Sequence, residues 1–431
     1  MSSSIIVSTV CFALALGCAA TARADRPAGK WSTGMPIVTY WAGPAAGFMA
    51  VNDLTISQLA AGGWNLGWAD TPADLDVYQR HGVRAMLMIR TPNVDDPKQA
   101  DALDSLVKQV KGHPALYAYY LVDEPGAGAF PGLAKLVGFL RKRDPAHLAY
   151  INLLPTYASD AQLNVTDDAA AKAKAGYPQN FAGAPDDGTS TRYSEYLRQF
   201  VGTVKPDLIS YDHYHFMKNS DGAQYFLNLA LIRKTALAAK VPFMNIIQTC
   251  DSPAEGWRGP GENELRWLTY TSLAYGAQAI SHFRYDIGLW KDPKNPDAPL
   301  PLYWALSGIN RDFIAIATHL QPLKSLGAYH CGTVPYGGEA LPKASPFAPS
   351  PERQEILLGY FGKSAKSPTH VAVVNLDYKK AVTTMLVGPG PMEALHAPTS
   401  TWHALEGGNR VRLELAPGGG VLVRVSSSRK H

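Results

Sequence analysis

The sequence has very few cysteines for its length. Only four of its 431 residues are cysteine, and two of these, Cys11 and Cys18, lie in an apolar N-terminal stretch. The remaining pair, Cys250 and Cys331, cannot supply a zinc site of three or four thiolates, and no C-x-x-C pair exists to build one with two histidines. Whether this pair forms a disulfide stays open, because pairing requires proximity in the fold.

Charge is also scarce. Charged residues make up 18 % of the chain, below the usual quarter, whereas apolar residues reach 46 % and aromatic residues 10 %. This composition excludes a disordered chain, which would be rich in charge and poor in aromatic residues. The 40 basic and 36 acidic residues nearly balance, and the longest basic run is Arg141–Arg143. We therefore expect no nucleic-acid partner.

No segment offers a convincing membrane span. The apolar stretch Ile5–Ala20 is too short and too small in its side chains, and Ala22–Ala24 follows it as an A-x-A cleavage signal. We therefore expect residues 1–24 to be a signal peptide and the protein to be exported, to the periplasm or beyond the cell. Lipidation at Cys18 is the less favoured alternative, because Ala15 stands where leucine is usual.

From residue 36 to residue 320, eight apolar strand-like segments alternate with eight helix-like segments. The expected strands are Pro36–Trp41, Trp64–Trp68, Val83–Ile89, Leu116–Val122, Leu148–Leu154, Asp207–Tyr211, Val241–Gln248 and Ala279–Tyr285. Strict alternation predicts parallel strands joined by crossover helices. Eight such units predict an α/β fold, a (β/α)8 TIM barrel, over residues 25–324. No G-x-G-x-x-G follows the first strand, so a dinucleotide-binding sheet has little support.

After Pro322 the pattern changes to short alternating runs separated by Gly and Pro turns. These runs predict a small all-β C-terminal domain, a sandwich, over residues 325–431. We expect this domain to support the barrel, with carbohydrate binding as the alternative role. A long segment without a clear period, from Pro155 to about Arg192, interrupts the barrel after its fifth strand.

The strand ends of the predicted barrel are rich in carboxylates and aromatic rings. Active sites of such barrels lie at these carboxyl ends. Glycoside hydrolysis needs one carboxylic acid and one carboxylate there, and flat rings suit the apolar face of a sugar. Glu124 ends a nearly apolar strand, where burial would raise its pKa, so we predict it to be the general acid/base, with Asp212 as the second carboxylate. The predicted substrate-binding residues are Trp41, Trp68, Asp123, Asn152, Tyr211, His213, His215, Gln248, Trp257, Arg284 and Tyr285.

The stretch Tyr120–Pro125 resembles the fourth-strand motif of TIM-barrel glycoside hydrolases of the large retaining clan, in which the Glu is the acid/base. Residues 206–214 and 264–285 are similar to the barrel of microbial β-galactosidases. The resemblance implies a Glu nucleophile at the end of the seventh strand, but the sequence has Ile247 and Gln248 there. The nucleophile is therefore not carried over.

Other carboxylates remain candidates for that role, and two other functions remain open. After Asp212, the next candidates are Asp251 and Asp286. One alternative function is a carbohydrate-binding barrel that has lost catalysis, motivated by the missing Glu. The other is a metal-dependent hydrolase that uses Asp212, His213 and His215, although a His-x-His pair alone is a weak metal signal. We expect a carbohydrate substrate, no cofactor and no metal.

Overall fold

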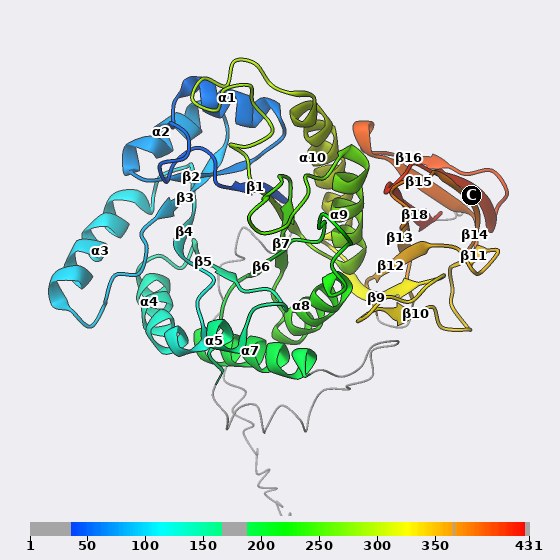
Figure 1. Ribbon diagram of the computed structural model, residues 1–431, viewed down its shortest axis with the longest axis horizontal. Helices are drawn as coiled ribbons and strands as arrows, with labels where there is room; N and C mark the ends of the chain where they lie inside the picture. The colour runs from blue at the N-terminus through cyan, green and yellow to red at the C-terminus, as the bar shows by residue number, and fades with distance from the viewer. Residues whose placement is uncertain (1–35, 166–187, 365–366, 427–431) are drawn as a thin grey trace, which may run out of the picture.

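A computed structural model describes residues 36–165, 188–364 and 367–426 (Figure 1). The expected signal peptide, residues 1–24, lies outside the described residues, as does part of the long segment after the fifth strand. None of the helices in the described part of the chain is long and apolar enough to span a membrane.

The first part of the chain is the predicted parallel barrel, and this prediction is confirmed. Its strands are β1 (Ile37–Trp41), β2 (Leu66–Ala69), β3 (Arg84–Met88), β4 (Leu116–Asp123), β5 (Leu148–Leu153), β6 (Ile209–His213), β7 (Phe243–Gln248) and β8 (Ala279–Phe283). They pair in the order β1-β8-β7-β6-β5-β4-β3-β2, all in parallel.

Helices surround the strands as an outer ring (Figure 1). They are α1 (Asp53–Ala61), α2 (Pro72–Arg80), α3 (Pro97–Val110), α4 (Phe130–Arg143), α5 (Asp160–Leu163), α7 (Thr189–Val204), α8 (Tyr225–Ala239), α9 (Glu262–Tyr275) and α10 (Pro301–Leu320). Local signals set their ends. At the start of α1, the Asn52 side chain accepts the Thr55 N–H at 3.0 Å and the Thr55 hydroxyl accepts the Asn52 N–H at 3.1 Å. Gly276, at a φ of +94°, ends α9.

No strand ladder joins the described strands β1 and β2, and the barrel is closed there by one backbone bond, from the N–H of Asn65 to the carbonyl of Val38 at 3.1 Å, and by side chains. The Asn65 side chain accepts the N–H of Val38 at 2.9 Å and donates to the carbonyl of Pro36 at 2.8 Å. The Tyr40 hydroxyl accepts the N–H of Trp68 at 3.0 Å. Backbone groups that would otherwise be unpaired inside the barrel are thus satisfied.

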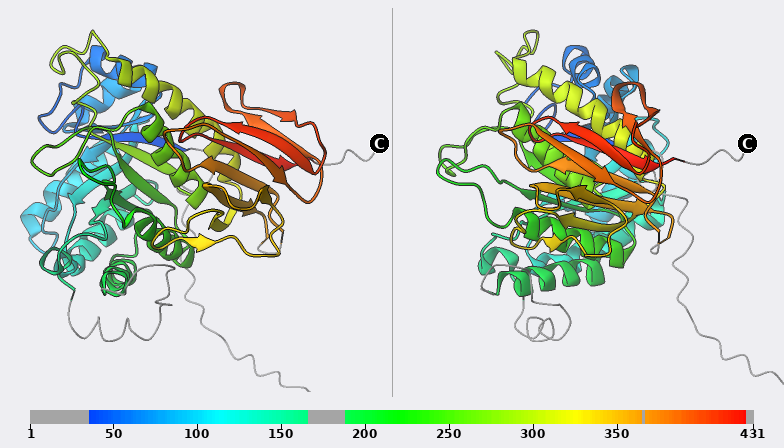
Figure 2. Two further views of the ribbon diagram at one scale, coloured as in Figure 1. Left: turned by 45° about the vertical axis from the view of Figure 1, so that its right-hand side comes forward. Right: turned by 90° about the vertical axis from the view of Figure 1, so that its right-hand side faces the viewer.

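The C-terminal part is a sandwich of two sheets, which confirms the all-β prediction. Their strands pair in antiparallel fashion except for β9 and β10, which pair in parallel. One sheet has the order β10-β9-β12-β13-β18-β15-β16, and the other has the order β11-β14-β17. The strands are β9 (Lys324–His330), β10 (Glu339–Ala340), β11 (Ala348–Ser350), β12 (Ile356–Gly362), β13 (His370–Asn375), β14 (Val382–Val387), β15 (Met392–His396), β16 (Thr401–Ala404), β17 (Arg410–Leu415) and β18 (Gly420–Val425). The larger sheet packs against the barrel beside α9 (Figure 2).

Strand β12 shows how one sheet serves two cores. Leu358 and Tyr360 belong to the core of the sandwich, whereas Leu357 and Phe361, which point to the other face, belong to the core of the barrel. Between them, Gly359 lies directly against α9, and a Cβ atom on it would stand 2.3 Å from the carbonyl oxygen of Ala274. Only glycine permits this approach of the sheet to the helix.

We therefore predict that Gly359→Ala lowers the free energy of unfolding by about 1–3 kcal/mol, because the added methyl group forces the sheet away from α9. The matched control is Gly138→Ala, at an exposed position in α4 where a Cβ atom meets nothing within 4 Å. This change should raise the same free energy by roughly 0.5–1 kcal/mol. Urea unfolding followed by tryptophan fluorescence measures both, and equal effects would contradict the prediction.

Candidate active site

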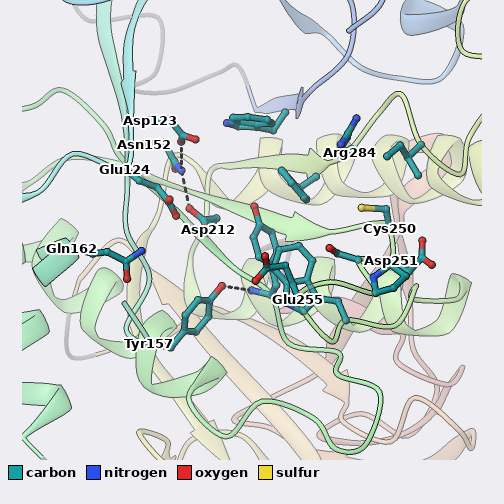
Figure 3. A pocket seen from close by; sticks show the side chains of 17 residues that line it. Asp123, Glu124, Asn152, Tyr157, Gln162, Asp212, Cys250, Asp251, Glu255 and Arg284 are labelled. Carbon is teal, nitrogen blue, oxygen red and sulfur yellow. Dashed lines mark hydrogen bonds between the residues drawn. The ribbon is translucent and has the colours of Figure 1, made fainter. Parts of the chain in front are cut away.

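A cleft of about 710 Å³ opens at the carboxyl ends of the barrel strands (Figure 3). Strands β1, β4, β5, β6 and β8 contribute residues at or next to their carboxyl ends, and the loops after β7 and β8 form the opposite side. The lining side chains are those of Trp41, Asp123, Glu124, Asn152, Tyr157, Gln162, Asp212, Tyr214, Cys250, Asp251, Ser252, Pro253, Glu255, Trp257, Phe283, Arg284 and Ile287.

Two carboxyl groups from different strands meet in this cleft. Glu124 follows β4 in the left-handed region, at a φ of +46°, and its N–H donates to the carbonyl of Asn152 at 2.9 Å. Strain of this kind collects at functional sites, where the surrounding structure holds it in place. The Glu124 side chain turns toward Asp212, which is buried near the end of β6 (Figure 3).

Burial is the main cause that raises the pKa of both groups. The neighbouring charge of Asp123 raises the pKa of Glu124 further, and the charges of Glu124 and Asp123 do the same for Asp212. Contact between the two carboxyl groups raises the pKa of Asp212 and lowers that of Glu124, so a proton held by the pair favours Asp212 in the free protein. The two groups therefore titrate as a pair that keeps one proton above the ordinary carboxyl range.

The side chain of Asn152 links this pair to Asp123. Its Nδ2 donates to Asp212 at 2.8 Å and to Asp123 at 3.0 Å (Figure 3). Its Oδ1 accepts the Ser210 hydroxyl at 2.9 Å, and that hydroxyl in turn accepts from Tyr150 at 3.0 Å. Because carboxylate oxygens accept hydrogen bonds, they fix the amide with both Nδ2 protons toward Asp123 and Asp212 and with Oδ1 toward Ser210.

A row of aromatic rings follows the cleft away from the carboxyl groups. The ring centroids of Trp41 and Phe283 lie 5.4 Å apart, those of Phe283 and Tyr214 4.8 Å, and those of Tyr214 and Trp257 4.4 Å. Trp41 also lowers the pKa of Asp123, and both residues line the cleft, so the row begins at the acidic cluster. Such a surface suits the apolar face of a sugar ring.

Seven of the thirteen residues predicted from the sequence line the cleft. They are Trp41, Asp123, Glu124, Asn152, Asp212, Trp257 and Arg284. Of the other carboxylates considered, Asp251 lines the cleft, whereas Asp286 is buried in an ion pair with Arg284. The sequence reasoning missed Tyr157 and Gln162, which lie in the segment without a period, and Phe283, which directly precedes a predicted residue.

The remaining six predicted residues do not line the cleft, which corrects their expected position. They are Trp68, Tyr211, His213, His215, Gln248 and Tyr285, and all are buried. Tyr211 and His213 flank Asp212 within β6, so the alternation of side chains turns them to the other face of the strand. There His213 bonds to Asn228 of α8 at 2.9 Å.

Trp68 and Tyr285 pack inside the barrel next to Tyr40, with ring centroids 5.8 and 5.2 Å from it. His215 stacks on Trp267 of α9 at 4.8 Å. Burial lowers the pKa of His213 to about 3 and that of His215 to about 4, so both imidazoles are neutral at physiological pH. Their positions are therefore explained by packing.

The metal hypothesis finds no arrangement that suits it. Within the described residues, no group of three His, Cys, Asp or Glu side chains is placed to hold a metal ion. Asp212 faces the cleft, whereas His213 and His215 face the helices.

The structure also answers the open question of a disulfide. Cys250 and Cys331 are both free thiols, so they form no disulfide with each other.

Gln248 occupies the position at which the resemblance implies a nucleophilic Glu. Its Oε1 accepts the N–H of Phe216 at 2.8 Å, and its Nε2 donates to the carbonyls of Phe216 and Arg258 at 3.1 and 2.9 Å. The carboxamide thus joins the loop after β6 to the loop after β7. A carboxylate could make only the first of these bonds, because it has no proton to donate.

The barrel, with its polar strand ends, is the fold of TIM-barrel glycoside hydrolases, the class that the sequence motifs resemble. A glycoside hydrolase of family 5 from Bacteroides vulgatus matches with a TM-score of 0.53 and 12 % identity, over 92 % of this chain and 90 % of that chain. A second protein, described as a glycoside hydrolase, matches with a TM-score of 0.51 and 11 % identity, over 88 % and 89 %. At these identities the likeness concerns the fold. No family model and no curated protein matches the sequence.

The hydrogen bonds by which the Gln248 carboxamide joins the two loops, here called the clamp, lead to a prediction. Gln248→Glu should lower the free energy of unfolding by about 1–3 kcal/mol, because it sets a carboxylate against two buried carbonyl oxygens. Gln162→Glu is the control, since the Gln162 Oε1 only accepts, from the N–H and hydroxyl of Ser159 at 2.9 Å. The control should stay within about 0.5 kcal/mol of the wild type. Thermal unfolding measures both, and a Gln248→Glu protein as stable as its control would refute the clamp.

Proposed function

We propose that this protein is an exported glycoside hydrolase that cleaves glycosidic bonds of an oligo- or polysaccharide. The observation that carries the proposal is the pair of neighbouring carboxyl groups, Glu124 and Asp212, at one end of an open cleft with an aromatic row. Glu124 acts as the general acid/base and Asp212 as the second carboxylate. The fold of the structural neighbours supports the same class of reaction.

The shared proton supplies what glycoside hydrolysis needs. One carboxyl group must protonate the leaving oxygen, while the other attacks the anomeric carbon or activates water. Because burial and Asp123 hold the pKa of the pair high, one member remains protonated and the other charged at the same pH. The contact between them favours the proton on Asp212 in the free protein, so Glu124 acts as the acid once this proton has passed to it. Asn152 fixes Asp212 in place, which keeps the reacting oxygens oriented.

Substrate binding falls to the remaining lining residues. Trp41, Tyr214, Trp257 and Phe283 offer ring faces to the sugar, whereas Asp123 and Asn152 offer groups for its hydroxyls. The guanidinium of Arg284 is held by Asp286, with Nε 2.8 Å from Oδ1, and it closes the side of the cleft near β8. Export is part of the proposal on the strength of the signal-like residues 1–24 alone.

A carbohydrate-binding barrel without catalysis is the second candidate. The clamp role of Gln248 favours it, since no carboxylate ends β7 where the resembled enzymes carry their nucleophile. The two candidates share the cleft and the aromatic row and differ only in whether the carboxyl pair reacts. Turnover therefore distinguishes them.

The first test is a screen of plant and microbial glycans, followed by Glu124→Gln and Asp212→Asn on whichever glycan is cleaved. Each should lower kcat/KM at least 100-fold, because acid–base catalysis contributes that much. Glu262→Gln, which alters an exposed carboxylate outside the cleft, should leave kcat/KM unchanged. Activity of Glu124→Gln within about threefold of the wild type would refute the assignment. Tight glycan binding without cleavage by the wild type would favour the second candidate.

The pH dependence of kcat/KM gives an independent test. The negative charge of Asp123 raises the pKa of both Glu124 and Asp212, so Asp123→Asn should lower the pKa of the pair. The proton is then lost at lower pH, and the basic limb of the profile shifts to lower pH. The asparagine retains an oxygen that accepts from Asn152. A basic limb that stays in place or moves to higher pH would contradict the proposed role of the pair.

A further inference from the structure

The aromatic end of the cleft belongs to two loops that are joined to each other. The loop after β6, residues 214–224, carries Tyr214, and the loop after β7, residues 249–261, carries Trp257. Backbone bonds connect them: the N–H of Arg258 donates to Phe216 at 3.1 Å, and the N–H of Lys218 donates to Gly256 at 2.9 Å. Displacement of either loop would therefore move both aromatic rings.

Charged side chains extend this connection to α9. Asp221, in the first loop, accepts from the guanidinium of Arg258, in the second, at 3.2 Å. The same guanidinium donates to Glu264 of α9 at 2.6 Å and lies 4.6 Å above the ring of Phe216. Asp221 then has one oxygen left, and that oxygen is satisfied from outside the barrel.

The donor is Tyr378, in the turn between β13 and β14 of the sandwich. Its hydroxyl donates to Oδ2 of Asp221, and its ring lies edge-on against Phe216, with centroids 5.6 Å apart. Burial and the charge of Asp221 raise the pKa of Tyr378 to about 12, so the hydroxyl keeps its proton at physiological pH. One residue of the C-terminal domain therefore contacts the first loop by a hydrogen bond and by packing.

The turn that carries Tyr378 is itself held firmly. The carboxylate of Asp377 accepts the N–H groups of Lys379 and Lys380 at 2.8 and 3.0 Å. The carbonyl of Leu376 accepts the indole N–H of Trp267, on α9, at 3.1 Å. The turn is thus fixed both internally and against the helix, so Tyr378 meets the loop from a rigid support.

We propose that Tyr378 is a positioning residue through which the sandwich holds the two loops, and with them Tyr214 and Trp257, in the geometry that binds substrate. Tyr378 does not line the cleft, so it acts through Asp221 and Phe216 rather than by touching the ligand. The inference rests on the proposed function in naming a glycan as the ligand. It gives the C-terminal domain a share in substrate affinity without any carbohydrate site of its own.

The test is Tyr378→Phe, which keeps the ring and removes the hydroxyl. Amide hydrogen exchange of residues 214–222 and 251–259 should become about tenfold faster, because the loops open more readily. KM for the cleaved glycan should rise about fivefold while kcat changes less than twofold, since binding is altered and the carboxyl pair is not. Asp221→Ala should cause both effects at least as strongly, because it also removes the bond to Arg258, and the double variant should add little to Asp221→Ala alone.

Tyr360→Phe is the matched control. The Tyr360 hydroxyl donates to the carbonyl of Phe347 inside the sandwich and bonds to neither loop. Loss of this hydroxyl therefore tests the effect of a lower stability of the sandwich alone. Loop exchange and KM should stay at wild-type values in this control. Unchanged loop exchange in Tyr378→Phe, or a control that behaves like it, would overturn the inference. If the wild type binds no glycan, the proposed function fails, and hydrogen exchange alone still decides whether Tyr378 holds the loops.

Discussion

The contact between the carboxyl groups of Glu124 and Asp212 is the constraint on which the rest of the site depends. It forms because β4 and β6 end beside β5, whose Asn152 reaches both sides. Burying carboxyl groups costs folding free energy. Since their pKa values are raised in the folded protein, the contribution of the pair to the free energy of unfolding is greatest at low pH. That contribution is lost as the pH rises through the folded pKa values. The apolar barrel offsets that cost.

That offset explains the composition of the chain. Strands buried on both faces leave little place for charge, and the few polar groups inside are bonded in defined pairs. The same holds between β1 and β2, where the side chains of Asn65 and Tyr40 each form a defined hydrogen bond with a backbone N–H group in place of a strand ladder. At the cleft, Asn152 and Gln248 do comparable work: each is a neutral amide that donates to fixed acceptors, and each joins two elements.

Much of the fold follows from the sequence, because strand and helix periods alternate clearly from residue 36 to residue 320. The carboxyl pair was also predictable, since strand ends meet at one face of a barrel. The expected position of His213 is wrong for a physical reason: β6 continues through His213, beyond its expected end at Tyr211, so side-chain alternation still applies there. His215 lies beyond the strand and is held by its stacking on Trp267. The clamp of Gln248 and the contact of Tyr378 depend on bonds between distant segments, which no local pattern reveals.

Gln248 also gives the end of β7, which carries no carboxylate, a structural role. The end of β7 binds the backbone of two loops, while the carboxyl groups of the cleft come from β4 and β6. The carboxyl pair lies on one side of the cleft, and the aromatic rings of those loops form the other. Under the proposed function, the position that carries the nucleophile in the resembled enzymes therefore joins two loops here. In this arrangement Asp212 is the carboxylate best placed to act together with Glu124.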